Sequence, residues 1–229
     1  MQTKIIFEDK DIIVVYKPAG IAVQGARIGQ PDVVSELKGY LAAKEKQAGT
    51  PPYLGIIHRL DQPVEGLLVF AKSRKAAADL SRQLQDAGFH KEYRAAVCGI
   101  PGPQTRELVD YLKKEEGRAV VCAGEGKKAI LHLEVMQTKK AGEENVSLLS
   151  VHIETGRFHQ IRAQLSHAGF PILGDKKYGS EKSLSLSDAM GVCNVALSAG
   201  RLFFRHPVTH KKLEYTSTPV NPVFSIFTE

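Results

Sequence analysis

Residues 57–66 read IHRLDQPVEG, and they join two short apolar segments of the chain. Leu54 and Ile56 lead into the stretch, and residues 67–71 lead out of it. Both segments are too short for helices and are bounded by Gly and Pro, so each is predicted to be a buried strand. The stretch between them is therefore predicted to be a loop held between two core strands.

Asp61 is the candidate catalytic residue of this loop. Pro63 disfavours a helical conformation for the residue before it, and Gly66 permits tight backbone geometry. A carboxylate on a loop that rigid strands hold in place is a common arrangement in active sites. The alternative is an aspartate that only caps a turn, and the local sequence leaves both interpretations open.

The composition is that of a globular protein with a moderate positive charge. The 229 residues are enough for one large domain or two small ones. A formal net charge of +6 and a pI of about 9.1 favour a polyanionic partner such as RNA, DNA or an anionic membrane. The N-terminus has no signal-peptide pattern, and no apolar run approaches the roughly 20 residues of a membrane-spanning helix.

The chain has three widely spaced cysteines in apolar stretches: Cys98, Cys122 and Cys193. We expect buried, reduced thiols and hence a cytoplasmic protein. No CxxC pair exists, and the histidines that could act as ligands show no metal-binding spacing: His58, His159 and His167. The sequence therefore predicts no metal site.

The elements before the central loop and after it are predicted from hydrophobic periodicity. Strands are predicted at 5–7, 12–16, 90–99, 119–122, 129–135, 146–153, 192–197, 201–205 and 212–217. Helices are predicted at 33–46, after the candidate N-cap Ser73, and from 154–157 onward. Residues 47–52 and 180–187 are expected to be loops, the second one mobile. The simplest account is one mixed α+β domain over residues 1–229, dominated by antiparallel sheet.

Several enzyme classes lack support. The chain contains no GxGxxG, GxxxxGK[ST], HExxH or GxSxG motif, which argues against nucleotide-binding, zinc-protease and esterase functions. The HRLD sequence differs from the kinase HRD loop by the inserted Leu60, and no DFG accompanies it. Asp61 and Glu65 could suggest the paired carboxylates of a glycosidase, but the surrounding motifs do not.

Two residues far along the chain could act with Asp61. If the sheet brings Arg162 close to it, the guanidinium would hold the carboxylate ionised and oriented, as a nucleophile or base requires. The alternative is a solvated arginine on the polar face of a helix. Tyr93 on a strand is either packing or an aromatic face for an extruded RNA base. Arg59 and Arg157 suit phosphate contact, although single surface arginines are common.

The ordered motifs together resemble the RluA-type family of pseudouridine synthases. They are DIIVVYKPAGIAVQ, HRLD-x4-GLLVFAK, KEYRA and TGR-x-HQIR-x-QL-x-HAGFPILGD-x2-YG. The resemblance extends from Asp11 to about Ser217. It implies a mainly antiparallel sheet with a central catalytic cleft. It also implies isomerisation of uridine to pseudouridine in RNA without a cofactor or a metal. Our first hypothesis is that the substrate is ribosomal or transfer RNA, and we expect a monomer.

The resemblance also implies roles for individual residues. Asp61 matches the essential aspartate of the family, Tyr93 its active-site tyrosine, and Arg162 the basic residue that pairs with the aspartate. Arg59 matches the arginine assigned to the gap that the flipped base leaves in the RNA stack. With Arg157 and His159 it forms the predicted RNA-binding set.

The chain departs from the family pattern at a few places. Glu65 stands where a small hydroxyl residue is common, and it adds negative charge beside Asp61. Gln24 stands where a histidine often follows KPAG. No RNA-binding domain of the S4 type fits before Lys4, so we expect the catalytic domain alone to recognise a short stem-loop. Glu65 leaves open a second hypothesis, a non-catalytic RNA-binding or assembly factor that keeps the fold.

Overall fold

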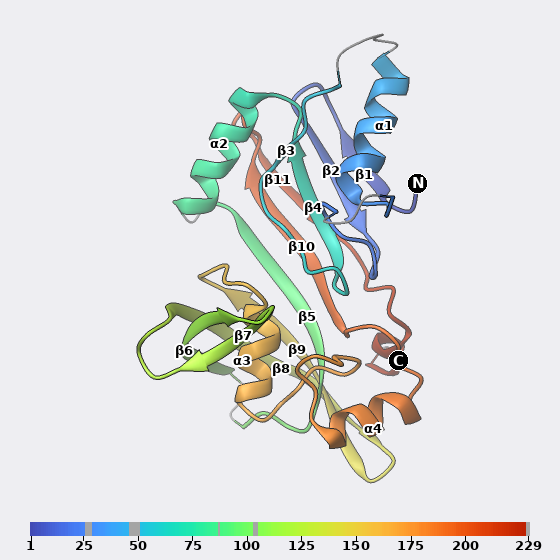
Figure 1. The fold of residues 1–229 in the computed structure, drawn as a ribbon, viewed down its shortest axis with the longest axis vertical. Helices are drawn as coiled ribbons and strands as arrows, with labels where there is room; N and C mark the ends of the chain where they lie inside the picture. The colour runs from blue at the N-terminus through green and yellow to red at the C-terminus, as the bar shows by residue number, and fades with distance from the viewer. Residues whose placement is uncertain (26–28, 46–50, 87, 103–104, 228–229) are drawn as a thin grey trace. The chain divides into compact units, whose positions relative to one another are not determined.

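A computed structural model describes residues 1–229 except 26–28, 46–50, 87, 103–104 and 228–229 (Figure 1). The chain divides into two compact units. Met1–Lys91 with Ala199–Thr218 form unit 1, and Glu92–Ser198 with Pro219–Glu229 form unit 2. The chain passes from unit 1 to unit 2 within strand β5 (His90–Cys98) and returns within strand β10 (Leu197–Arg205). That residues 1–229 form a single catalytic domain stays a prediction, which this division into units does not test.

Unit 1 contains a mainly antiparallel sheet. Its strands are β1 (Lys4–Glu8), β2 (Ile12–Lys17), β3 (Gly55–Ile56), β4 (Glu65–Ala71), β10 from Ala199 onward, and β11 (Lys212–Thr216). The strand order is β1-β2-β4-β10, with β3 paired to β4 and β11 paired to β10. The antiparallel pairing of β1 with β2 confirms the hairpin predicted from two β-branched runs.

Strands β2 and β4 are central because every one of their residues is buried. Their antiparallel register runs from the Ile12–Ala71 pair to the Lys17–Gly66 pair. Gly66 has φ of +131°, and a Cβ built there would lie 2.5 Å from the Ala199 backbone nitrogen. Only glycine fits this position, which directly follows the loop that carries Asp61.

Two helices belong to unit 1, α1 (Val33–Glu45) and α2 (Arg74–Gln85), and Figure 1 shows each beside the strands of its unit. The Ser73 hydroxyl accepts from the Ala76 N–H at 3.2 Å, which confirms the predicted N-cap. α2 has Asp86 as its C-cap. Most of the loop predicted at 47–52 lies outside the described residues.

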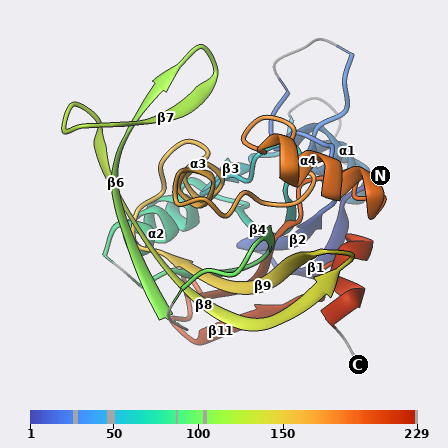
Figure 2. The ribbon, with the colours of Figure 1, turned by 90° about the horizontal axis from the view of Figure 1, so that it is seen from below.

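Unit 2 contains an antiparallel sheet in the order β5-β9-β8-β6-β7. Besides the rest of β5, its strands are β6 (Thr105–Glu115), β7 (Arg118–Cys122), β8 (Lys127–Ala141) and β9 (Glu144–Ile153). Figure 2 shows β6 and β7 as a green hairpin. The sequence prediction omitted β6, because charged side chains alternate irregularly along it. It also ended the strand predicted at 129–135 too early, because β8 continues to Ala141.

Two expectations for the second half of the chain are wrong, and one element was not expected. Residues 180–187 are not a loop, because α4 (Glu181–Ala189) begins there. Ser180 and Ser183 form a reciprocal capping box at its start, so serines that suggested a loop nucleate a helix. No strand covers 192–197, since β10 begins at Leu197 and continues unbroken to Arg205. A final 3₁₀ helix, η1 (Pro222–Phe227), was not predicted.

Helix α3 (Gln160–His167) begins later than the predicted start at 154–157. The Gln160 side chain accepts from the Arg157 N–H at 3.0 Å and from the Thr155 hydroxyl at 2.8 Å, which holds the preceding turn. His159 is left-handed, with φ of 52°, so the helix cannot extend backward through it. Arg162 is only 4% exposed, which contradicts the alternative of a solvated arginine on a polar helix face.

The cysteines are free thiols, but they differ in exposure. Cys98 is buried, Cys122 is partly buried and Cys193 is exposed. The prediction of three buried thiols is therefore wrong for Cys193. Among the described residues, no helix has both the length and the apolar character needed to cross a membrane.

Candidate active site

The loop that carries Asp61 is bonded to the turn after β2. The N–H of Gly20 donates to the Gln62 carbonyl at 2.8 Å, and the Gln62 side chain donates back to the Gly20 carbonyl at 2.9 Å. The N–H of Val64 donates to the Asp61 carbonyl at 3.0 Å, closing a turn. These bonds fix the loop on both sides of the half-buried Asp61, as a working carboxylate requires.

Lys17 stands behind this loop and is 0% exposed. Its ammonium donates to the carbonyls of Pro18 at 3.0 Å, Ile21 at 2.8 Å and Gln62 at 3.1 Å. All three N–H donors of the charged form are thus used. Burial lowers the pKa of Lys17 to about 8, while the carboxylates of Asp61 and Glu65 act in the opposite direction.

Glu65, the unusual residue of the motif, is 3% exposed at the start of β4. Its carboxylate interacts electrostatically with the Lys17 ammonium, as does that of Asp61. One buried cation therefore faces two carboxylates in this loop. The charge that Glu65 adds is compensated from within unit 1, so it gives no reason to set catalysis aside.

His58 is a packing residue of unit 1. It is buried, and its Nε2 accepts from the Val69 N–H at 3.3 Å. Its ring meets the Phe89 ring edge-on, with 5.1 Å between centroids. Burial lowers its pKa well below the ordinary histidine value, so the side chain is neutral in the folded chain.

Arg59 is exposed, as a residue that contacts RNA should be. Its guanidinium donates to the Gln24 side chain at 2.9 Å. Gln24, which stands where a histidine was expected after KPAG, thus orients Arg59, the residue predicted to enter the gap left by the flipped base.

In unit 2, Arg162 forms a bidentate ion pair with Asp175. Its Nε donates to one carboxylate oxygen at 2.7 Å and its Nη2 to the other at 2.8 Å. Asp175 is fully buried and also accepts from the backbone N–H groups of Lys177 and Tyr178. The guanidinium is therefore held in one orientation before any substrate binds.

Tyr178 connects this ion pair to the surrounding side chains. The Arg162 guanidinium lies 5.0 Å from the centre of its ring, and the Arg118 guanidinium lies 5.2 Å from it. The Tyr178 hydroxyl accepts from the Ala119 N–H and forms a second hydrogen bond with Nδ1 of His159, 2.8 Å away. Burial raises the pKa of the phenol, which keeps it a neutral hydrogen-bonding group.

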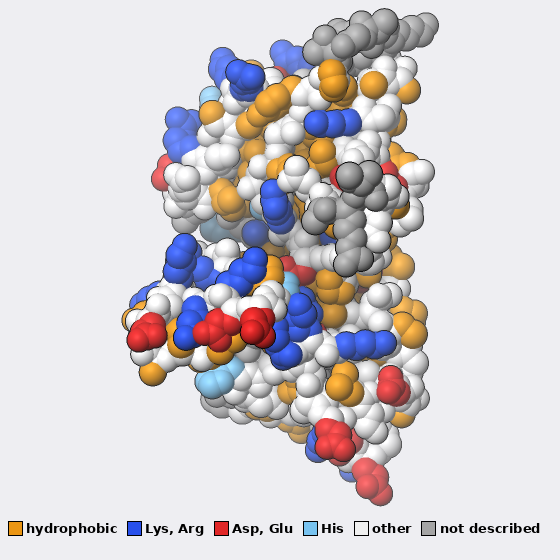
Figure 3. All heavy atoms as spheres, in the orientation of Figure 1, with side chains coloured by type: hydrophobic (Ala, Val, Ile, Leu, Met, Phe, Trp, Pro, Cys, Tyr) orange, Lys and Arg blue, Asp and Glu red, His pale blue; other side chains and the backbone are white. Residues whose placement is uncertain are grey.

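The predicted RNA-binding residues of unit 2 lie near other basic side chains. Arg157 is exposed, and its Nε donates to the Lys128 carbonyl at 2.9 Å. His159 stacks on the exposed Phe158 at 3.7 Å, and the Lys114 ammonium lies 4.8 Å from the Phe158 ring. Figure 3 shows Lys and Arg side chains where β6 and β7 lie, with acidic side chains among them. The arrangement suits contact with a phosphate backbone.

The predicted catalytic trio is divided between the units. Asp61 belongs to unit 1, whereas Tyr93 on β5 and Arg162 on α3 belong to unit 2. Tyr93 is buried and pairs in register with Val151 of β9. The assembly of the three side chains into one site stays a prediction.

Sequence reasoning gave no role to three residues that position the candidate side chains within their own units: Lys17, Asp175 and Tyr178. A signal for Lys17 was available, since it ends the otherwise apolar run IIVVYK. Asp175 and Tyr178 lie within the quoted motif HAGFPILGD-x2-YG. Their roles depend on contacts 13 and 19 residues away along the chain, which periodicity does not show.

One cluster in unit 1 has the composition of a metal site. Ligand atoms of Asp9, Asp11 and His206 lie within 4.8 Å of one another. However, Nδ1 of His206 accepts from the N–H groups of Val208 and Thr209, so the proton is on Nε2, which donates to Asp9 at 2.8 Å. A metal ion on Nε2 would require imidazolate, and the cluster is better explained as a hydrogen-bonded clasp between two turns.

The sequence relatives of this chain are pseudouridine synthases. The chain is 36% identical over 219 residues to "Ribosomal large subunit pseudouridine synthase D" of Zymomonas mobilis, covering 93% of this chain and 68% of that protein. It is 31% identical to "Uncharacterized RNA pseudouridine synthase YlyB" of Bacillus subtilis, covering 94% of this chain and 68% of that one. The chain thus spans about two thirds of the length of these two relatives.

Solved structures and a family model agree with these relatives. The fold is similar to that of human RNA pseudouridylate synthase domain containing 4, with a TM-score of 0.76, 22% identity, and coverage of 98% of this chain and 92% of that one. This likeness supports the predicted α+β fold with a mainly antiparallel sheet. The family model described as RNA pseudouridylate synthase matches residues 11–167. The chain belongs to the RNA pseudouridylate synthase family, with relatives of the RluA type.

Proposed function

We propose that this protein converts specific uridines of ribosomal RNA to pseudouridine, with Asp61 as the catalytic carboxylate. Membership of the family makes the chain an RNA-modifying isomerase. Relatives that match most of its length are named for the ribosomal large subunit, which favours ribosomal RNA over transfer RNA as the substrate. The observation that carries the role of Asp61 is its place in a loop bonded on both sides and backed by the buried Lys17.

The reaction breaks the glycosidic bond from N1 of uracil to C1′ of the ribose and forms a bond from C5 to C1′. The C5 proton leaves and N1 gains a proton, so the change is an isomerisation that needs no oxidant or reductant. Asp61 either attacks C1′ or removes a proton from C2′. Both routes require an ionised carboxylate that is positioned against the ribose.

Tyr93 and Arg162 supply the other proposed roles. Tyr93 stacks on the uracil ring and assists removal of the C5 proton. A guanidinium has five N–H donors, and the ion pair with Asp175 takes two of them. In the proposal, Arg162 also holds Asp61 ionised and oriented, while Asp175 and Tyr178 fix the direction of its guanidinium.

RNA recognition involves side chains from both units. Arg59 enters the space that the flipped uridine leaves, and Gln24 keeps its guanidinium extended. Arg157 and His159 contact phosphates on the unit 2 side. The proposal includes a cytoplasmic monomer that works without a metal or a cofactor.

The experiment that tests the proposal compares Asp61→Asn with Asp86→Asn, a change at an exposed aspartate of the same unit. Large-subunit ribosomal RNA is incubated with each variant, and pseudouridine is mapped by carbodiimide modification and primer extension. We expect Asp61→Asn to abolish pseudouridine while RNA affinity stays close to that of wild type, and Asp86→Asn to retain activity. Full activity of Asp61→Asn would remove this carboxylate from the chemistry. RNA binding by the wild type with no pseudouridine at any position would instead favour the assembly-factor hypothesis.

A further inference from the structure

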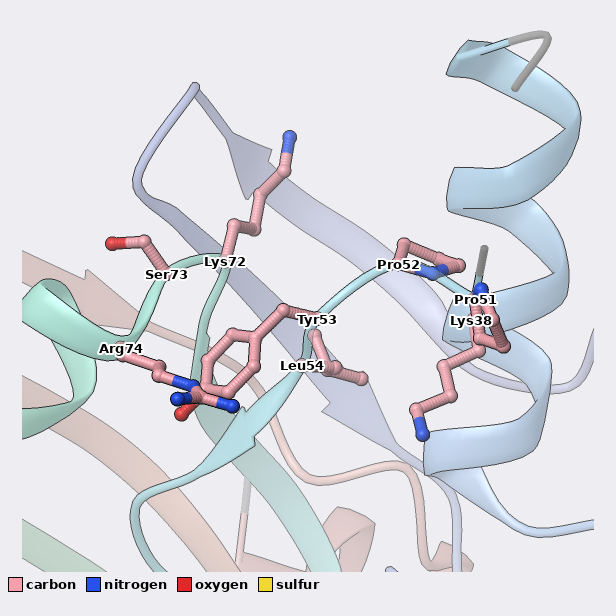
Figure 4. A pocket seen from close by; sticks show the side chains of 8 residues that line it. All are labelled: Lys38, Pro51, Pro52, Tyr53, Leu54, Lys72, Ser73 and Arg74. Atoms are coloured by element: carbon pink, nitrogen blue, oxygen red, sulfur yellow. The ribbon is translucent and has the colours of Figure 1, made fainter. Parts of the chain in front are cut away.

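Unit 1 has an open pocket away from the Asp61 loop, with a volume of about 660 Å³. Helix α1, the segment 51–54 and the start of α2 form its walls (Figure 4). The lining residues are Lys38, Pro51, Pro52, Tyr53, Leu54, Lys72, Ser73 and Arg74. The volume lies within the roughly 300–1,000 Å³ of pockets that bind small ligands or single nucleotides.

The charge of the lining is entirely positive, and two of its cations are presented to solvent. Lys72 is committed to the scaffold, since its ammonium donates to the Glu8 carboxylate and to the Asp9 carbonyl, each at 2.7 Å. Figure 4 shows Lys72 pointing away from Tyr53, whereas Lys38 and Arg74 enter from opposite walls. Within the described part of the chain, no carboxylate forms an ion pair with Lys38 or Arg74. The pocket therefore attracts an anion that can reach both walls.

Tyr53 adds a flat aromatic surface that the backbone holds in place. Its side chain is 41% exposed, between the conformationally restricted Pro52 and the buried Leu54. A Cβ built on Gly55 would lie 3.0 Å from the Tyr53 hydroxyl and 3.0 Å from Cβ of Ala77. The absence of a side chain at Gly55 thus leaves room for the tyrosine hydroxyl beside α2, while two fifths of the residue stays exposed to a ligand.

We propose that this pocket binds an unpaired nucleotide of the RNA, outside the target uridine. Tyr53 stacks on its base, Arg74 contacts one phosphate through its planar fork, and Lys38 contacts the neighbouring phosphate. The combination of a phosphate-binding arginine with an exposed ring is typical of single-stranded RNA recognition. The inference rests on the proposed function only in that RNA is the ligand, and it gives the enzyme a second contact with single-stranded RNA that does not depend on which base is bound.

The experiment uses the full chain and two probes, a large-subunit ribosomal RNA transcript and single-stranded oligouridylate of about ten nucleotides. Affinity is measured by fluorescence anisotropy over a range of salt concentrations for Tyr53→Ala, Tyr53→Phe, Arg74→Ala and Lys38→Ala. The matched control is Lys75→Ala, because Lys75 is exposed next to Arg74 on α2 but does not line the pocket. Thermal unfolding identifies any variant that fails to fold.

We expect Tyr53→Ala to weaken binding of both probes by about tenfold or more, and Tyr53→Phe to restore it. Arg74→Ala and Lys38→Ala should each lower the slope of log affinity against log salt by about one, while Lys75→Ala leaves it unchanged. Equal losses for Arg74→Ala and Lys75→Ala would overturn the proposal in favour of nonspecific charge, as would unchanged binding by Tyr53→Ala. Because affinity is the readout, the result does not depend on whether Asp61 is catalytic.

Discussion

Each unit buries a cation, Lys17 in unit 1 and Arg162 in unit 2, and the groups that hydrogen-bond to the two cations differ. In unit 1, neutral carbonyl groups surround the Lys17 ammonium, and burial lowers its pKa to about 8. In unit 2, the buried carboxylate of Asp175 holds the Arg162 guanidinium in a bidentate pair. The first cation can lose its proton near physiological pH, whereas an arginine remains charged. The comparison predicts that the function of the Asp61 loop depends on pH through Lys17. The function of Arg162 should depend instead on an intact ion pair with Asp175.

The largest effect is expected where that ion pair is broken. Asp175→Ala leaves the guanidinium of Arg162 buried without its carboxylate, which should lower the free energy of unfolding by about 3–5 kcal/mol. Urea unfolding at neutral pH measures the loss. We expect activity to fall as well, because the guanidinium no longer has a fixed direction.

Two further variants sharpen this prediction. The control is the pair between Arg82, whose side chain is 67% exposed, and the partly buried Asp79, and Asp79→Asn should cost less than about 1 kcal/mol. The double variant Asp175→Leu with Arg162→Met removes both charges, so it should recover much of the lost stability but no activity. If Asp175→Ala costs no more than Asp79→Asn, the buried pair is not what orders unit 2.

A smaller effect is expected at Lys17, and it should separate stability from activity. Between the folded pKa of about 8 and the unfolded value of 10.5, the folded state binds fewer protons than the unfolded state, so stability rises with pH in that window. Activity should change in the opposite direction. Deprotonation removes one of the three N–H donors and the positive charge that faces Asp61 and Glu65.

Parallel urea unfolding and pseudouridine assays from about pH 7 to about 10 check this divergence. Lys17→Met should have low activity, and this activity should not decline near pH 8. Any pH dependence that remains in this variant does not come from Lys17 and measures the titration of other groups, including the substrate. Activity and stability of the wild type that fall together above pH 8 would show that the loop simply unfolds, and the proposed role of the ammonium would be wrong.

Glu65 should shift the pH at which activity declines, and this effect should be smaller than that of Lys17. Its carboxylate raises the pKa of Lys17 against the effect of burial, so Glu65→Gln should move the high-pH decline in activity to lower pH by less than about one unit. Asp86→Asn, at an exposed carboxylate, should not move it. A shift to higher pH, or a loss of activity at neutral pH, would mean that Glu65 acts on the substrate and not through Lys17.

The contrast between the units also explains what the sequence could predict. The loop that carries Asp61 could be predicted because the loop and both flanking strands are consecutive in the chain. The position of Arg162 could not, because its helix begins late and its partner Asp175 lies beyond the helix. Helix α4 was mistaken for a loop because serine-rich segments favour turns, although Ser180 and Ser183 also match a capping box. Strand β6 was missed because its many charged residues leave no clear alternation of apolar and polar positions.

The smallest predicted effects test whether the units unfold together. Ser73 caps α2 in unit 1 and Ser180 caps α4 in unit 2, so alanine at either position should cost about 1 kcal/mol. Because the chain changes unit within β5 and again within β10, unfolding one unit alone would leave two strands half formed. We therefore expect each substitution to accelerate the slowest amide hydrogen exchange in both units, with Ser73→Thr as the control that keeps the cap. Faster exchange confined to the substituted unit would contradict a single domain over residues 1–229. Asp61 and Arg162 would then belong to two units that fold separately.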